Sequence, residues 1–307
     1  MRKVILLCAS LFTMVLLSAS PVRAQSLAWV APNGNDANGC SQTTPCATFA
    51  GAYSKGGVVE INCLGSGNYG TITITSSLTI DCGTGSVGNI NSAVASGITI
   101  NTTAAATIVL RHLALNGFST NSLVNGITAT SFFSGTLIVE DCMIHGYHAG
   151  IGINFQPASG RGLLQVSNSQ IFDNVDGVIV QPASGQIASV TLNQVELVAN
   201  SIDGLFLNGG VVAGTMRDSV VGENGEDGVL TEAGQVFFTI EESSIVDNLA
   251  NGIQTDSAGS AIKVAASTIG GNGTGVLASA GSIVSFGDNH MSDNGSDGNF
   301  TSTIALK

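Results

Sequence analysis

The chain is poor in charge, in aromatic side chains and in long apolar runs. Only 10% of its 307 residues are charged, and Lys and Arg together number 9. Nucleic acids and anionic membranes are bound through clusters of Lys and Arg, so we expect no nucleic-acid partner. Beyond residue 24, no stretch is long and apolar enough to cross a membrane as a helix, so we expect no membrane span.

The longest apolar run lies at the N-terminus. Arg2 and Lys3 precede an apolar run that ends at Leu17, and Val22-Arg23-Ala24 fits a cleavage site. A membrane anchor is the alternative, but the run is short of the roughly 18–20 apolar residues that a spanning helix needs. We predict that residues 1–24 are a signal peptide cleaved near Ala24, and that the protein is secreted or periplasmic. Cleavage would remove three cations and change the formal net charge from −12 to −15.

What the chain has in abundance is glycine, 40 residues, and a repeat of about 24 residues. Each repeat places an apolar anchor three residues before an Asn, with a Gly a few residues later. The Asn positions are Asn174, Asn200, Asn224, Asn248, Asn272 and Asn294. A fixed period of 20–50 residues indicates a solenoid, because one unit cannot bury its apolar face without stacked neighbours.

Apolar columns appear when the repeats are aligned on their anchors. The anchors are Ile144, Ile171, Leu197, Val221, Ile245, Ile269 and Met291, and the positions five and seven residues earlier are almost wholly apolar as well. This alternation is typical of a strand with one buried face. Three short strands in each repeat predict an all-β fold, a single-stranded parallel β-helix of about 8–10 coils.

The Asn column predicts a structural ladder along one edge of the solenoid. Each amide can bond to turn backbone and to the Asn of the next coil. We expect the Gly that follows to adopt positive φ. Tyr147 and Phe118 occupy the Asn position in the two earlier coils, so the ladder should begin at Asn174.

The cysteines point to an oxidising compartment. Five remain after the predicted cleavage, and in an exported chain we expect the bridges Cys40–Cys46 and Cys63–Cys82. Cys142 falls in a column that otherwise holds mostly Ser. We therefore expect a buried thiol there, not a nucleophile.

These repeats, from about residue 107 to 300, resemble the right-handed parallel β-helix proteins of the pectin-lyase-like superfamily. The segment from Trp29 to Asp36, followed by Cys40 and Cys46, is similar to the entry segment of many exported bacterial members. The resemblance implies a cap helix, here about residues 47–54, over the open end of the coil. We therefore expect an N-terminal cap segment over 25–57 and a β-helix domain over 58–307.

The superfamily includes pectate lyases, other polysaccharide lyases and hydrolases, phage tailspikes and non-catalytic surface proteins, so the fold leaves the activity open. Its pectate lyases use acidic residues to hold calcium, and an Arg as base. Comparable positions here are Arg111, His112, Glu140, Asp141, Arg217, Asp218, Glu241, Glu242 and Asp288. Arg111, His112, Glu140 and Asp141 lie on adjacent coils and form our candidate site, with a solvated patch as the alternative. The Asp-Asp signature of polygalacturonases is absent.

Carboxylates also follow the Asn turn. Asp176, Asp203, Asp227 and Asp297 precede the Gly of their repeats. Stacked carboxylates could be stabilised by calcium, whereas Asp before Gly is also an ordinary turn solution. We assign no metal ligands and no cofactor from this pattern, and calcium stays an open alternative.

The third strand of each coil presents an apolar column where solvent is expected. We place Gly152, Ile179, Phe206, Leu230, Gln254 and Leu277 in this column. The apolar members Ile179, Phe206, Leu230 and Leu277, here called the outer stripe, predict either an interface, including one between copies of the chain, or a surface covered by the chain's own C-terminal tail, residues 301–307.

The sequence favours an exported scaffold that associates with carbohydrate, or with another protein, without strong catalysis. The alternative is a polysaccharide lyase or glycoside hydrolase of the pectin-lyase-like group. Whether the protein is an enzyme therefore stays open at this stage.

Overall fold

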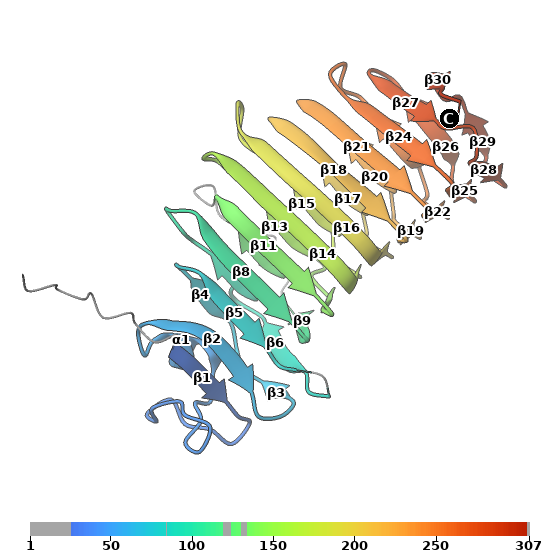
Figure 1. The fold of residues 1–307 in the computed structure, drawn as a ribbon. Helices are drawn as coiled ribbons and strands as arrows, with labels where there is room; N and C mark the ends of the chain where they lie inside the picture. The colour runs from blue at the N-terminus through green and yellow to red at the C-terminus, as the bar shows by residue number, and fades with distance from the viewer. Residues whose placement is uncertain (1–25, 84, 119–123, 130–133, 306–307) are drawn as a thin grey trace, which may run out of the picture.

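The structure is a computed structural model that describes residues 26–83, 85–118, 124–129 and 134–305 (Figure 1). The predicted signal peptide, residues 1–24, lies outside the described residues. The described chain winds into a parallel β-helix of about nine turns. None of its helices is long and apolar enough to cross a membrane.

Three rows of parallel strands run along the solenoid. The first row consists of β1 (Ser26–Val30), β2 (Val58–Cys63), β5 (Leu78–Asp81), β8 (Ala106–Arg111), β11 (Gly135–Glu140), β14 (Arg161–Phe172), β16 (Ile187–Val198), β18 (Val211–Arg217), β21 (Gln235–Glu241), β24 (Ala261–Ala265), β27 (Ser282–Ser285) and β30 (Ser302–Thr303). The second row consists of β3 (Gly67–Asn68), β6 (Gly88–Ser92), β9 (Leu113–Gly117), β12 (Met143–His145), the distal halves of β14 and β16, β19 (Val220–Gly222), β22 (Ser244–Val246), β25 (Thr268–Gly270) and β28 (His290–Ser292).

The third row is a separate ten-stranded sheet. Its strands are β4 (Ile72–Ile74), β7 (Ile98–Ile100), β10 (Ile127–Ala129), β13 (Ile153–Phe155), β15 (Val178–Val180), β17 (Leu205–Leu207), β20 (Val229–Thr231), β23 (Asn251–Thr255), β26 (Thr274–Ala278) and β29 (Ser296–Gly298). The first two rows join into one sheet because β14 and β16 each run through the bend between them.

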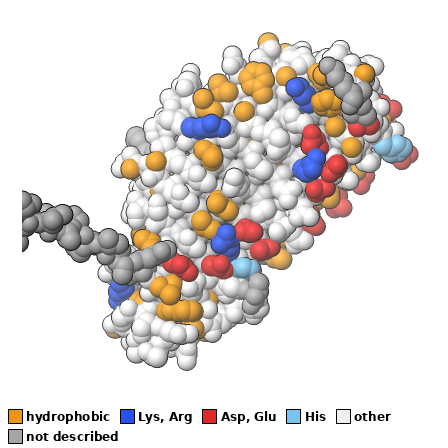
Figure 2. All heavy atoms as spheres, viewed as in Figure 1, with side chains coloured by type: hydrophobic (Ala, Val, Ile, Leu, Met, Phe, Trp, Pro, Cys, Tyr) orange, Lys and Arg blue, Asp and Glu red, His pale blue; other side chains and the backbone are white. Residues whose placement is uncertain are grey.

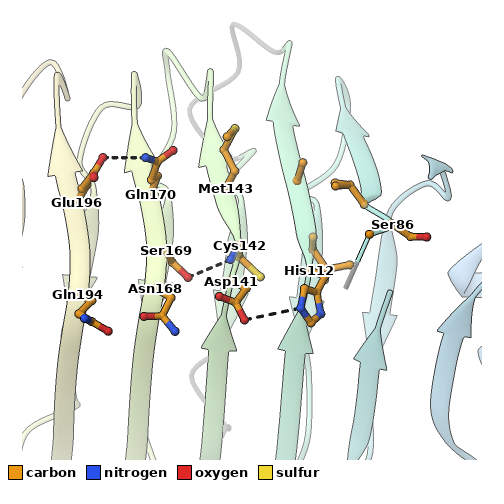
Figure 3. A pocket seen from close by; sticks show the side chains of 14 residues that line it. Ser86, His112, Asp141, Cys142, Met143, Asn168, Ser169, Gln170, Gln194 and Glu196 are labelled. Atoms are coloured by element: carbon orange, nitrogen blue, oxygen red, sulfur yellow. Dashed lines mark hydrogen bonds and ion pairs between the residues drawn. The ribbon is translucent and has the colours of Figure 1, made fainter. Parts of the chain in front are cut away.

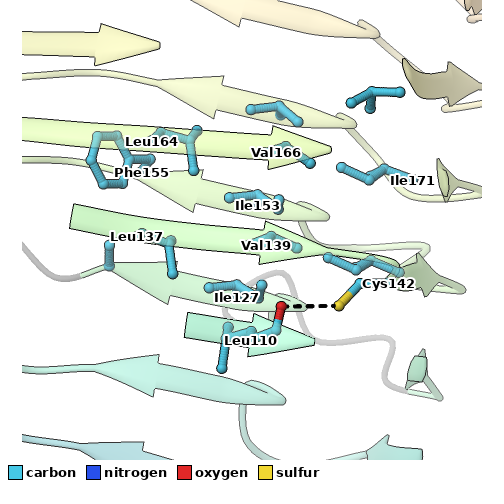
Figure 4. Packing of buried hydrophobic residues seen from close by; sticks show 14 of the residues in the cluster. Leu110, Ile127, Leu137, Val139, Cys142, Ile153, Phe155, Leu164, Val166 and Ile171 are labelled. Carbon is cyan, nitrogen blue, oxygen red and sulfur yellow. Dashed lines mark hydrogen bonds between the residues drawn. The ribbon is translucent and has the colours of Figure 1, made fainter. Parts of the chain in front are cut away.

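The predicted anchors pair in register from coil to coil. Ile144 pairs with Ile171, Ile171 with Leu197, and the column continues to Met291. Alternate side chains of each strand point into one continuous core, part of which is shown in Figure 4. The period of two in the sequence thus becomes a buried inner face.

The Asn ladder is formed as the repeat predicts. Asn224 is fully buried, and its side-chain oxygen accepts from the side-chain amide of Asn200 at 3.0 Å. Its own amide donates to Asn248 at 2.8 Å and to the Leu197 carbonyl at 3.1 Å. The same pattern links Asn174 through Asn294.

A second ladder lies in the small-residue column of Cys142. The hydroxyl of Ser243, for example, accepts from the backbone N–H of Ser219 at 3.2 Å, and Ser169 accepts from Cys142 in the same way at 3.1 Å.

Two details of the Asn turn differ from the prediction. The residues before the Asn adopt positive φ, including Asp173 at 57° and Glu223 at 56°, whereas the Gly residues after the first five ladder Asn residues do not. Gly is needed there because the backbones of adjacent coils lie too close for a side chain: a Cβ on Gly204 would lie 2.8 Å from the Gly228 carbonyl oxygen. Phe118 is 69% exposed and takes no place in the ladder, unlike the buried Tyr147.

The N-terminal end is closed by a short helix and a disulfide-bonded loop. Cys40–Cys46 and Cys63–Cys82 are both bonded, as predicted. The helix α1 (Phe49–Tyr53) has only five residues, shorter than the predicted 47–54. Its Phe49 and Ala52 are buried in the end of the core. The entry segment also contributes β1, which pairs with β2.

Candidate functional site

A groove lies along the bend between the first and second strands of successive coils. Its volume is about 810 Å³. Four bend residues, one from each of four coils, line it: His112, Asp141, Asn168 and Gln194. Each has positive φ, between 48° and 55°, because the chain must turn sharply there without breaking the sheet pairing. The groove therefore runs across the coils and parallel to the axis of the solenoid (Figure 3).

Arg111 lies beside the groove in a register column of charged residues. It pairs with Asp81 on one side and with Glu140 on the other. Its Nε lies 2.6 Å from Glu140 Oε2, and its Nη1 lies 4.0 Å from Asp81 Oδ2. The guanidinium is thus held between two carboxylates. In Figure 2, basic and acidic side chains meet in small groups on a surface that is mostly uncharged.

His112 connects this column to the groove. Its Nδ1 lies 2.8 Å from Asp81 Oδ1, and its Nε2 lies 3.7 Å from Asp141 Oδ2 (Figure 3). The side chain of His112 is 20% exposed. A carboxylate on one imidazole nitrogen fixes the orientation of the ring and leaves the other nitrogen facing the Asp141 side.

The structure thus brings Arg111, His112, Glu140 and Asp141 together, and it adds Asp81. Asp81 could not be found from the repeat, because 30 residues separate it from its partner Arg111, outside the 24-residue period. The usable signal was its place at the end of an alternating strand, as for Arg111 and Glu140. The other cationic candidate, Arg217, pairs instead with Glu241 at 3.0 Å and Glu242 at 3.8 Å, away from the groove.

An amide and a carboxylate extend the groove toward the C-terminus, and these too were missed from sequence. Gln170 and Glu196 project from the second-row halves of β14 and β16. The Gln170 amide donates to Glu196 Oε2 at 2.9 Å (Figure 3). Such residues in a turn-rich sequence look like ordinary surface, and only the coil register shows that they share one face.

Cys142 lies beneath the groove and is not bonded to another cysteine. It is 4% exposed, and its thiol donates to the Glu140 carbonyl at 3.2 Å. Burial raises the pKa of this thiol to about 12. A nucleophilic role needs the thiolate, so Cys142 is a core residue, as predicted.

The carboxylates after the Asn turn form a buried column, here called the acidic column: Asp176, Asp203 and Asp227. Asp203 accepts from the backbone N–H of Asp227 at 2.9 Å, and Asp227 accepts from Asn251. Burial raises the pKa of all three, to about 7 for Asp203. Among the described residues, no group of three or more His, Cys, Asp or Glu side chains could hold a metal ion.

The outer stripe lies on the third-row sheet. Ile179, Phe206 and Leu230 are half-buried, and Leu277 is 39% exposed. Asn154, not Gly152, precedes Ile179 in this column, because the turn after Tyr147 is longer than those of the later coils. The described part of the C-terminal tail pairs with β27 in the other sheet and does not run along the stripe.

Comparisons with known proteins show the fold. No family model matches the chain, and no curated protein matches its sequence. Pectate lyase Pel9A matches over 92% of this chain and 79% of its own, at 17% identity and a TM-score of 0.67. The A-module of the mannuronan C-5 epimerase AlgE4 from Azotobacter vinelandii matches over 81% of this chain and 91% of its own, at 12% identity and a TM-score of 0.48. The chain has the pectin-lyase-like parallel β-helix fold.

Proposed function

We propose that this protein is an exported β-helix scaffold that binds an extended polysaccharide chain in the groove. In this reading residues 25–57 form its cap segment and 58–307 its β-helix domain. One observation carries the proposal: His112, Asp141, Asn168 and Gln194 line one groove on four consecutive coils. A linear polymer of repeating units suits a row of polar side chains that itself repeats at the strand spacing of about 4.8 Å.

The composition of the groove supports a glycan ligand. Asn168, Gln170 and Gln194 supply amides for sugar hydroxyls, while Ala114 and Met143 supply apolar surface for ring faces. Binding sites for small ligands combine apolar lining with a few placed polar groups. The fold shared with pectate lyase Pel9A is in keeping with a polysaccharide ligand. The two disulfides are in keeping with an oxidising compartment.

The test is binding of oligosaccharides to the full chain by calorimetry. Gln194→Ala should weaken binding about tenfold, the loss expected for a hydrogen bond whose partner is left unpaired. Gln165→Ala is the matched control, because Gln165 is an exposed amide on β14 outside the groove. Equal effects of the two substitutions, or no oligosaccharide binding at all, would reject the proposal.

A second function, cleavage of the bound chain, is favoured by one observation. Asp81 holds His112 Nδ1 at 2.8 Å while Nε2 faces the Asp141 side of the groove. A base oriented by a carboxylate is the usual arrangement of a proton-transfer catalyst. Release of reducing ends that disappears in His112→Ala, but persists in His148→Ala, would establish this activity.

For polygalacturonate we expect no robust lyase activity, with or without calcium. A uronate lyase must neutralise a substrate carboxylate, but Arg111 is already engaged by Glu140. The assay is the rise in ultraviolet absorbance from unsaturated product. Turnover that Arg111→Ala or Asp141→Asn abolishes would make the lyase function the correct one.

A further inference from the structure

Three side chains in or beside the groove place hydrogen-bond donors against carboxylates of the protein. The Arg111 guanidinium donates to Glu140 at 2.6 Å, and the Gln170 amide donates to Glu196 at 2.9 Å. His112 lies between Asp81 and Asp141. The oxygens of these carboxylates have further lone pairs, since an ionised carboxylate offers about four acceptor positions and no donor. These carboxylates can therefore accept hydrogen bonds from donors on a ligand.

The groove also carries an excess of negative charge. Asp141 and Glu196 line it, and Asp81 and Glu140 adjoin it through His112 and Arg111. Among the described residues, none of the groove-lining side chains is Lys or Arg. A chain of uronates would bring its carboxylates against these groups, and like charges in contact oppose binding.

The acidic side chains are spaced along the direction in which a polymer would lie. Asp141 belongs to the coil of β11, and Glu196 to the coil of β16, two coils further on. Two coils span about 10 Å along the axis. A sugar unit in an extended glycan advances by a distance similar to one coil, so amines on sugars two units apart would reach both carboxylates.

We infer that the groove selects a glycan with free amino groups, such as a polymer of glucosamine, over its N-acetylated form and over uronates. This inference rests on the proposed function, namely that the groove binds a polysaccharide. The ammonium groups supply both the donors and the positive charge for Asp141 and Glu196. The N-acetyl form keeps the sugar shape but loses the charge.

The experiment compares pentamers of glucosamine, N-acetylglucosamine and galacturonate at a mildly acidic pH, by calorimetry on the full chain. The glucosamine pentamer should bind about tenfold more tightly than the acetylated one, as expected for two ion pairs of ordinary surface strength. Added salt should remove most of that difference. The double variant Asp141→Asn and Glu196→Gln should bind both pentamers alike. Asn tolerates the φ of 52° at position 141, so the fold should survive.

The control removes the same charge elsewhere. Glu223→Gln together with Asp293→Asn changes two exposed carboxylates outside the groove and should keep the preference. If this control abolishes the preference equally, the amines respond to the net charge of the protein and the inference fails. If galacturonate or the acetylated pentamer binds as tightly as glucosamine, the selectivity fails while the groove function stands. If no pentamer binds, both fail.

Discussion

The coils in the two halves of the solenoid are held together in different ways. From Asn174 onward, each coil repeats nearly the same length and is linked to the next by the Asn ladder. Before Asn174, the coils vary in length, Tyr147 replaces the Asn, and two disulfides and α1 close the end. The groove begins in the irregular coils and ends in the first ladder coils. The candidate groove thus spans the boundary between the irregular and the regular coils.

The largest expected effect lies in the regular half, at Gly204. A Cβ there would meet the Val221 side chain at 2.5 Å and the Gly228 carbonyl oxygen at 2.8 Å. Gly204→Ala should lower the free energy of unfolding by about 3 kcal/mol, because a packed backbone cannot move aside. Urea unfolding measures this. Gly185→Ala, at φ 77° in open surroundings, should cost only about 1 kcal/mol. Equal costs would contradict the close stacking of the coils.

A residue of the Asn ladder should contribute more to the free energy of unfolding than the Tyr147 hydroxyl does. Asn224→Ala leaves the Asn200 and Asn248 amides and the Leu197 carbonyl short of partners. We expect a loss of about 2–3 kcal/mol in the free energy of unfolding. Tyr147→Phe removes only the bond to Ser92 Oγ, at 3.0 Å, and should cost about 1 kcal/mol. If thermal melts show that Asn224→Ala lowers stability less than Tyr147→Phe does, the ladder is not the main source of stability in the regular half.

The acidic column should make the regular half more stable at mildly acidic pH. Burial raises the pKa of Asp203 to about 7, against about 3.9 in an unfolded chain. Between these values the folded protein binds a proton that the unfolded protein does not, so stability falls as pH rises through this window.

The change from pH 5 to pH 8 should be roughly 2–3 kcal/mol in the free energy of unfolding. Asp203→Asn should flatten this dependence, and the exposed control Asp288→Asn should leave it intact. A pH profile that Asp203→Asn leaves unchanged would assign the dependence to other groups.

The smallest effects on stability concern the two Arg–Glu pairs, one in each region. Arg111→Ala breaks a partly buried ion pair between adjacent coils, and Arg217→Ala breaks an exposed one. Each should cost less than about 1 kcal/mol in the free energy of unfolding. Measurements of glycan affinity should distinguish the two variants, because only Arg111 adjoins the groove. A change in affinity caused by Arg217→Ala would place the binding surface elsewhere.

The sequence predicted most of the regular half, because each of its features recurs every 24 residues or so. Side chains that recur at the coil period must stack, so the anchor column and the Asn ladder could be found without coordinates. The physical reason why each repeat needs its Gly could not be found in this way. A Gly required by positive φ and a Gly required by a close carbonyl look identical in a sequence.

The irregular half was harder to predict because its coils contain insertions. The longer turn after Tyr147 shifted the third-row column by two residues, so that Gly152 was placed where Asn154 lies. The insertion before Arg111 hid Asp81. The residues of the predicted cluster could be found because they lie at the ends of adjacent strands. Their pairing with Asp81, and the position of Gln170 beyond the bend, depend on how the coils are aligned with one another, which the sequence does not show.

The in-register pairing of the ladder coils has a consequence for how such a molecule can change in length. The first-row strands from β16 to β24 pair in register with the strand one coil away, so a whole coil can be gained or lost while the remaining strands keep equivalent partners. Gln-Pro-Ala-Ser-Gly at residues 156–160 and again at 181–185 has the form of such a duplicated unit. For the glycan proposed above, added coils would lengthen the binding surface in steps of about one sugar unit.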